Sequence, residues 1–190
     1  MAATLAAPTP AAAHLVQTGF GEFYDGIGHL FVTLPDIFVV VAVALLAGSS
    51  GAAAARRALV ALPVAWLVAG ISGSVAGTDI VSPWATTLLF GALAALVAID
   101  LKVSPSLVLL LSEVAGALHG WSDGAGVVEA LREIDPTAAT HGFLALSGIA
   151  AAVFVIVTIL SALVVPLKSY AARVVVRVAG SWLTAIAILM

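Results

Sequence analysis

Long runs of apolar residues, separated by short clusters of charged residues, Pro and Gly, make up most of this 190-residue chain. The runs are continuous and rich in Ala and Leu, a pattern typical of membrane-spanning helices and not of the alternating strands of a membrane barrel. A spanning helix needs about 20 apolar residues, so the pattern predicts an all-α transmembrane bundle of about six spans. The predicted spans are residues 35–47 with part of the preceding turn, 58–76, 83–99, 106–121, 138–163 and 174–190.

The composition supports this prediction and excludes several classes of protein. The chain is 63% hydrophobic and 9% charged, with a mean hydropathy of +1.22, whereas soluble domains are about 45–50% apolar and about 25% charged. Lipid is therefore expected to surround most of the chain. The absence of cysteine excludes disulfides, thiolate metal sites and Cys nucleophiles. The net charge of −3 and the lack of a basic stripe argue against nucleic acid as a partner.

The segments between the spans define the domain organisation. Residues 1–18 are rich in Ala, Pro and Thr and lack the Lys or Arg that begins a secretory signal, so they are predicted to be a disordered tail. An amphipathic segment over 19–33 leads into the first span. Loops are predicted over 48–57 and 122–137. Because no internal repeat is visible, residues 19–190 are predicted to form one transmembrane domain.

The basic residues predict the orientation of the bundle. Lys and Arg concentrate in the cytoplasmic loops of membrane proteins, and only Arg132 falls on the opposite face from the other six. We therefore predict that both termini lie outside, in a bacterial inner membrane. The outer face is acidic, which favours the attraction of cations, although acids also accumulate where basic residues are excluded. The six basic residues on the predicted cytoplasmic face are Arg56, Arg57, Lys102, Lys168, Arg173 and Arg177.

Three histidines near the predicted outer ends of spans are candidate metal ligands: His29, His119 and His141. Asp25 precedes His29 by four residues and Asp123 follows His119 by four, and residues four apart share one face of a helix. Each pair offers an imidazole nitrogen and a carboxylate oxygen, a donor set that suits first-row divalent cations. The alternative for each histidine is an interfacial side chain that is hydrogen-bonded to a carbonyl. No metal-binding motif such as HExxH is present.

Two further acids lie within the predicted spans. Asp36 stands near the start of the first span and Glu113 in the middle of the fourth. A carboxylate in the middle of a bilayer costs about 2.5–3.5 kcal/mol, so Glu113 is predicted to face the bundle interior and to hydrogen-bond a polar group there. A protonated, purely structural Glu113 is the alternative. Gly116 and Gly120 flank the region of His119 and permit close approach of another helix.

The residues around these histidines resemble the HupE/UreJ family of small nickel or cobalt permease-like membrane proteins. The segment 23–31, Phe-Tyr-Asp-Gly-Ile-Gly-His-Leu-Phe, is similar to the family's opening motif His-Pro-x-x-Gly-x-Asp-His. Gly26 and His29 match it, whereas Glu22 stands at the first His and Gly28 at the Asp. The segment 116–124 resembles the family's fourth-helix motif His-Gly-x-x-His/Asn-Gly, in which His119 matches and Asp123 replaces a His or Asn.

The resemblance implies a permease for a divalent transition-metal cation such as nickel. In that case an outer site captures the ion, and two acids pass the ion or its compensating protons inward. The predicted metal site comprises His29, His119, Asp25, Glu22 and Asp123, and the predicted pathway comprises Asp36 and Glu113. No nucleotide-binding motif is present, so transport is predicted to be secondary or channel-like, with no resident cofactor required.

The alternative function is a non-transporting accessory subunit packed against a larger membrane complex. Short loops and many small residues suit that role. An enzyme is not expected, since the chain lacks HExxH, GxSxG and any Cys nucleophile. The expected partners are membrane lipid, a transition-metal cation, and other membrane subunits or further copies of the chain.

Overall fold

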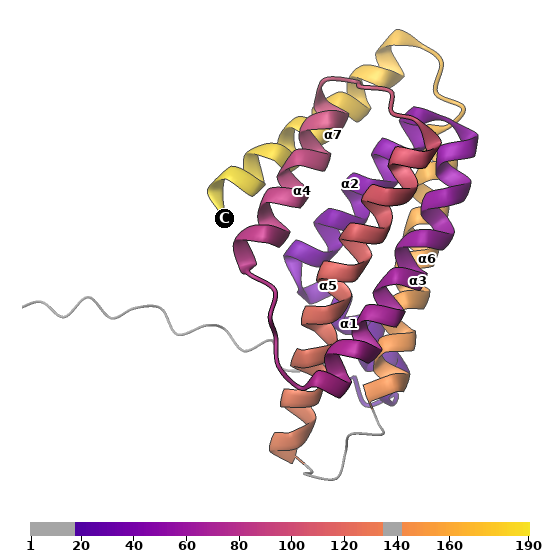
Figure 1. The fold of residues 1–190 in the computed structure, drawn as a ribbon. Helices are drawn as coiled ribbons and strands as arrows, with labels where there is room; N and C mark the ends of the chain where they lie inside the picture. Colours follow the sequence, from indigo (N-terminus) through magenta and orange to yellow (C-terminus); the bar gives the residue numbers. More distant parts are fainter. Residues whose placement is uncertain (1–17, 135–141) are drawn as a thin grey trace, which may run out of the picture.

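The computed structural model describes residues 18–134 and 142–190, which form an elongated bundle of α-helices (Figure 1). Within those ranges there is no β-strand, so the prediction of an all-α fold is confirmed. The predicted tail lies outside the described residues except for Thr18, and so does His141. The helices are α1 Glu22–Val32, α2 Leu34–Ser50, α3 Ala52–Ala76, α4 Pro83–Ala98, α5 Pro105–Ile134, α6 Gly142–Val164 and α7 Tyr170–Leu189.

Several helices have the length and apolar character of membrane spans. By these measures α3, α6 and α7 can each cross a membrane, and α1 with α2 can form one further, bent span. The apolar α4 is shorter, at 16 residues. Although α5 is 30 residues long, it carries polar residues including Glu113 and His119. The predicted number of six spans and the predicted orientation stay predictions.

Two predicted loops are helical in the structure. α2 continues to Ser50 and α3 begins at Ala52, so Arg56 lies within α3. Only Gly51 separates these helices. Its φ of 108° favours glycine, because any residue with a Cβ would be strained at that φ. The predicted loop over 122–137 is also wrong as far as residue 134, because α5 continues through it. Its buried face persists past Asp123 to Val127, which packs inside the bundle.

The helix α2 forms the centre of the bundle. It contacts every other helix of the described chain, and its side chains from Val39 to Ala47 are largely buried. In Figure 1, α2 lies between α4 and α6, with α7 outside α4. The core is therefore built around one apolar helix whose first turn, at Asp36, is also buried.

The closest helix contact joins α3 and α5, which run parallel to each other. Three glycines of α5, each four residues apart, lie directly on carbonyl groups of α3: Gly116 on Leu62, Gly120 on Trp66 and Gly124 on Gly70. Residue numbers rise together along both helices, which fixes their register. Glycine permits this approach because any Cβ would occupy the position of the facing backbone.

Replacing Gly120 by Ala is expected to destabilise the protein by about 1–3 kcal/mol, since the new methyl group would push α5 away from the α3 backbone. Gly126→Ala is the matched control on the same helix, because no atom lies within 4 Å of a Cβ at that position. The control should be neutral or stabilising by up to about 1 kcal/mol. Thermal unfolding in detergent measures both. Equal stability of the two variants would show that the α3–α5 contact is looser than described.

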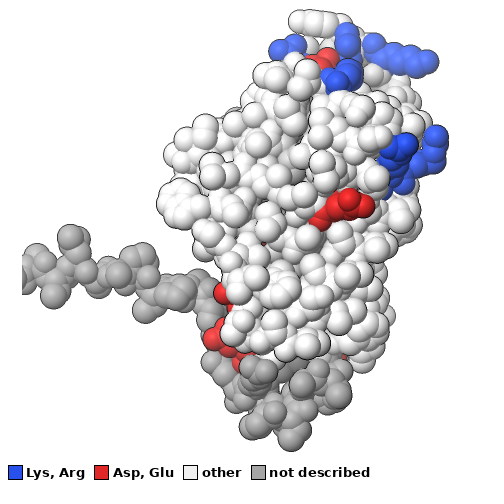
Figure 2. Space-filling view, viewed as in Figure 1, with Lys and Arg blue, Asp and Glu red and all other residues white. Residues whose placement is uncertain are grey.

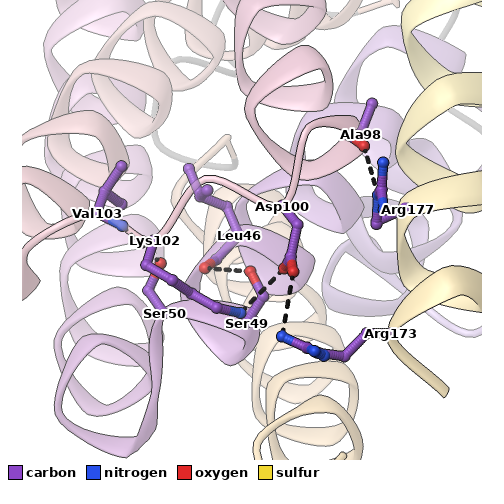
Figure 3. A network of polar contacts seen from close by, with 9 residues as sticks. All are labelled: Leu46, Ser49, Ser50, Ala98, Asp100, Lys102, Val103, Arg173 and Arg177. Carbon is purple, nitrogen blue, oxygen red and sulfur yellow. Dashed lines mark hydrogen bonds and ion pairs between the residues drawn. The ribbon is translucent and has the colours of Figure 1, made fainter. Parts of the chain in front are cut away.

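A network of polar contacts ties the α4–α5 connection to α7 at the basic end of the bundle (Figure 3). Asp100 accepts hydrogen bonds from Lys102 at 3.0 Å and from Arg173 at 3.5 Å. Arg177 donates to the carbonyl of Ala98 at 3.1 Å. These contacts hold α7 against α4 where the chain turns back into the bundle.

Candidate functional site

A sharp bend between α1 and α2 brings two candidate ligands together. The helix axes differ by 80° across Thr33, and the following Pro35 stands in the first turn of α2. Proline lacks the N–H and has the ring geometry that together prevent α1 from continuing through it, whereas the first turn of a new helix accepts it. His29 lies in the last turn of α1 and Asp36 in the first turn of α2. Both side chains are buried.

The helix α5 supplies the other two side chains from one face. His119 and Asp123 are four residues apart, and α5 is helical at both positions, so they lie one turn from each other. The approach of α3 to Gly120 places Trp66 beside them, with its ring centroid 5.4 Å from that of His119. Trp66 donates its indole N–H to Asp123 Oδ2 at 2.8 Å.

Each histidine pairs with an acid from a different helix. His119 Nδ1 lies 2.6 Å from Asp36 Oδ1, and His29 Nε2 lies 3.5 Å from Asp123 Oδ1. All four side chains are at most 7% exposed, so water contributes little to their solvation. The site thus joins α1, α2 and α5 through crossed His–Asp pairs.

Three of these residues have the geometry of a cation site. His29, Asp36 and Asp123 each offer a ligand atom, and these atoms lie within 4.8 Å of one another. Asp36 Oδ2 and His29 Nδ1 have no hydrogen-bond partner among the described residues. Two carboxylates buried this close repel each other and have lost hydration. A divalent cation would relieve both costs, and the nitrogen and oxygen donors suit a first-row transition metal.

His119 and Trp66 orient the acids of this cluster. An ionised carboxylate can only accept hydrogen bonds, so when Asp36 is ionised, as a ligand must be, His119 Nδ1 carries the proton and donates it. Trp66 fixes one oxygen of Asp123 and leaves Oδ1 directed toward His29. Such partners of ligating groups set the orientation of the donors.

Replacing Trp66 by Phe tests this positioning role, because Phe retains an apolar ring and removes the N–H. A buried carboxylate oxygen then loses its donor, which costs about 1–3 kcal/mol of stability. Cation affinity is expected to fall about 10-fold, within the range seen when partners of metal ligands are removed. Calorimetric titration of purified protein with nickel measures the affinity. The matched control is Trp182→Phe, since Trp182 is 70% exposed on α7 and should leave affinity unchanged; unchanged affinity in Trp66→Phe would remove Trp66 from the site.

The structure brings together some of the predicted site residues and separates others. His29 and Asp123 belong to the three-residue group together with Asp36, which was assigned to the pathway. His119, predicted as a ligand, lies outside that group and contacts it through Asp36. Asp25 lies elsewhere: its Oδ1 accepts hydrogen bonds from the backbone and hydroxyl of Thr18, both at 2.6 Å. Glu22 begins α1 and is likewise not part of the three-residue cluster.

Glu113 lies on the outside of the bundle, so the expectation that it faces the interior is wrong for the chain by itself. Its side chain is exposed in a groove between α3 and α5. It makes no hydrogen bond or ion pair with any side chain of the two described ranges. The buried face of α5 is the one with His119 and Gly120, and Glu113 is directed away from it.

Trp66 is a site residue that the sequence alone did not single out. Trp66 lies in the middle of α3 and is fully buried. Its distance from both ends of a 25-residue helix was a usable signal, because an interfacial tryptophan belongs near a helix end. A buried indole N–H needs an acceptor, and Asp123 supplies it.

Comparison with known proteins places the whole chain in one sequence family. Residues 2–190 match the family described as HupE / UreJ protein. No curated protein and no solved structure matches the chain. The match covers α1 and α5 together, and thus all four of the clustered His and Asp residues.

Proposed function

The chain belongs to the HupE/UreJ family, and from this premise we propose that it is a membrane permease for a divalent first-row transition-metal cation, nickel or a similar ion. The family is associated with nickel or cobalt transport and with urease accessory functions, and it is a transporter-type family rather than an enzyme family. The observation that carries the proposal is the buried group of His29, Asp36 and Asp123, whose ligand atoms lie within 4.8 Å of one another.

The bend between α1 and α2 supports a transport role. Secondary transporters commonly place their ion sites at interrupted helices, where the ends of the two halves face the substrate. Here the interruption at Thr33 lies between His29 and Asp36, and both side chains are buried. The bend is therefore the element whose rearrangement would expose the cation alternately to the two sides.

The charge distribution supports the proposed orientation. In Figure 2, Lys and Arg lie at the upper end of the molecule and in a second group part of the way down its side, and acidic atoms lie near the lower end. We propose six crossings, in which α1 and α2 form one bent span and α4 and α5 each cross once, with the basic end in the cytoplasm. The cluster is then nearer the outer side, since His119 lies 14 residues, or about 21 Å of helix, beyond the start of α5. A periplasm-active reporter fused after Met190 should be active; activity of a cytoplasmic reporter there would reverse this orientation.

Uptake by purified protein in liposomes tests the function directly. Liposomes that contain a nickel-sensitive dye should take up nickel only when the chain is present. The same liposomes should not take up calcium, which prefers six to eight oxygen ligands. The competing function, a non-transporting accessory subunit, predicts no uptake by the chain alone.

A further inference from the structure

A long apolar groove runs along the outside of α3 and α5, with a volume of about 870 Å³. Arg56 and Arg57 line one end of it, Trp121 lines the other, and Glu113 lies between them. The remaining wall is made of small and branched apolar side chains, including Ala61, Ala65, Val64, Val68 and Ala117. Small residues of this kind line surfaces on which membrane helices approach each other closely.

Glu113 is an unusual residue for a surface that faces lipid. A carboxylate within a span is costly in lipid and is normally covered by protein. In the single chain its side chain is exposed, and no described residue pairs with it. Figure 2 shows acidic atoms about halfway along the molecule, surrounded by uncharged atoms and close to a group of basic ones.

Two basic residues, Arg56 and Arg57, lie at nearly the same depth, and Arg56 is the one that has no partner among the described residues. Because Gly120 lies on the carbonyl of Trp66 and the two helices are parallel, Glu113 is level with Leu59 of α3. Leu59 is three residues, or about 4.5 Å of helix rise, from Arg56. Arg57 donates to Ser106 at 2.8 Å, whereas Arg56 has no hydrogen bond or ion pair among residues 18–134 and 142–190. Both unpaired charges therefore face the same groove at nearly the same depth.

We propose that this groove is the interface of a homodimer, in which a second copy of the chain covers it. Copies inserted in one orientation are related by a two-fold axis along the membrane normal, which brings equal depths of the two grooves together. Glu113 of each copy then meets Arg56 of the other, so the contact forms two reciprocal ion pairs. An acyl chain in the groove would offer neither charge a partner. The interface is independent of the cation site, which lies on the opposite, buried face of α5.

Single-cysteine crosslinking tests the interface, because the chain contains no cysteine of its own. Val64→Cys places a thiol in the groove, and Val155→Cys is the matched control on α6; the two valines are 54% and 50% exposed. After treatment of native membranes with a short bis-maleimide, V64C is expected to yield at least about 5-fold more dimer than V155C. Equal dimer yields from V64C and V155C would overturn the proposal. Lipid or another membrane subunit would then be the occupant of the groove.

A charge swap tests the reciprocal pairing in the same assay. In the V64C background, Glu113→Gln is expected to lower the dimer yield several-fold. Exchanging the charges, Glu113→Arg with Arg56→Glu, should restore it, because each copy again presents opposite charges at the two depths. Restoration by the exchange excludes a folding defect as the cause of the loss. A dimer yield that Glu113→Gln leaves unchanged, or that the exchange fails to restore, would contradict the pairing.

Discussion

Asp36→Asn is expected to lower cation affinity more than about 100-fold without unfolding the protein. Asp36 is a ligand candidate and also the hydrogen-bond partner of His119 at 2.6 Å. Asn has nearly the same shape and its carbonyl can still accept from His119, so the substitution removes mainly the charge. Loss of a partner of a ligand already costs 10–100-fold in metal affinity, and loss of a charged ligand should cost more. Titration of purified protein with nickel measures the loss.

The stability of the cation-free Asp36→Asn protein should change in the opposite sense. Two buried carboxylates repel each other when no cation lies between them, so neutralising one is expected to leave the unfolding temperature unchanged or raise it. Glu129→Gln is the control, since it removes an exposed acid of α5 that lies outside the cluster. An affinity within about 2-fold of the original protein in Asp36→Asn would contradict the role of Asp36 as a ligand.

His29→Ala is expected to lower cation affinity at least about 10-fold more than Asp25→Asn does. His29 supplies the only imidazole nitrogen of the three-residue group. Asp25 lies on the same helix face but is engaged by Thr18 at 2.6 Å through its Oδ1, so its loss should change affinity by less than about 3-fold. Competition with a chromophoric nickel chelator resolves both values. Equal losses in the two variants would indicate that α1 alone forms the site, through the pair four residues apart.

His29 and Asp25 also show which features of the site the spacing of residues in the sequence can predict. The spacing of Asp25 and His29 correctly placed both residues on one helix, and the apolar runs correctly predicted most of the helices. Spacing within one helix does not determine which residue of another helix lies opposite. That depends on the 80° bend at Thr33 and on the α3–α5 register, both of which arise from tertiary packing. The structure therefore pairs His29 with Asp123 and His119 with Asp36.

Glu113 and Asp123 illustrate two other limits of the sequence. Asp123 was placed at the edge of a polar loop, because an acid next to Ser122 interrupts the apolar run. In the structure it is a buried helical residue that accepts a hydrogen bond from Trp66 and lies 3.5 Å from His29. Glu113 was assigned to the interior because of the energetic cost of its charge in lipid. That cost holds for the assembled protein, whereas hydropathy alone cannot tell an interior face from one that a second chain covers.

The proposed function requires that His29, Asp36 and Asp123 bind the cation. Equilibrium dialysis of the purified protein against nickel, followed by metal analysis, tests it most directly when the original chain is compared with the Asp36→Asn, Asp123→Asn double variant. We expect one bound ion per chain in the original protein and none above background in the double variant. Equal metal content in the two proteins, or no bound nickel in the original chain, would contradict it.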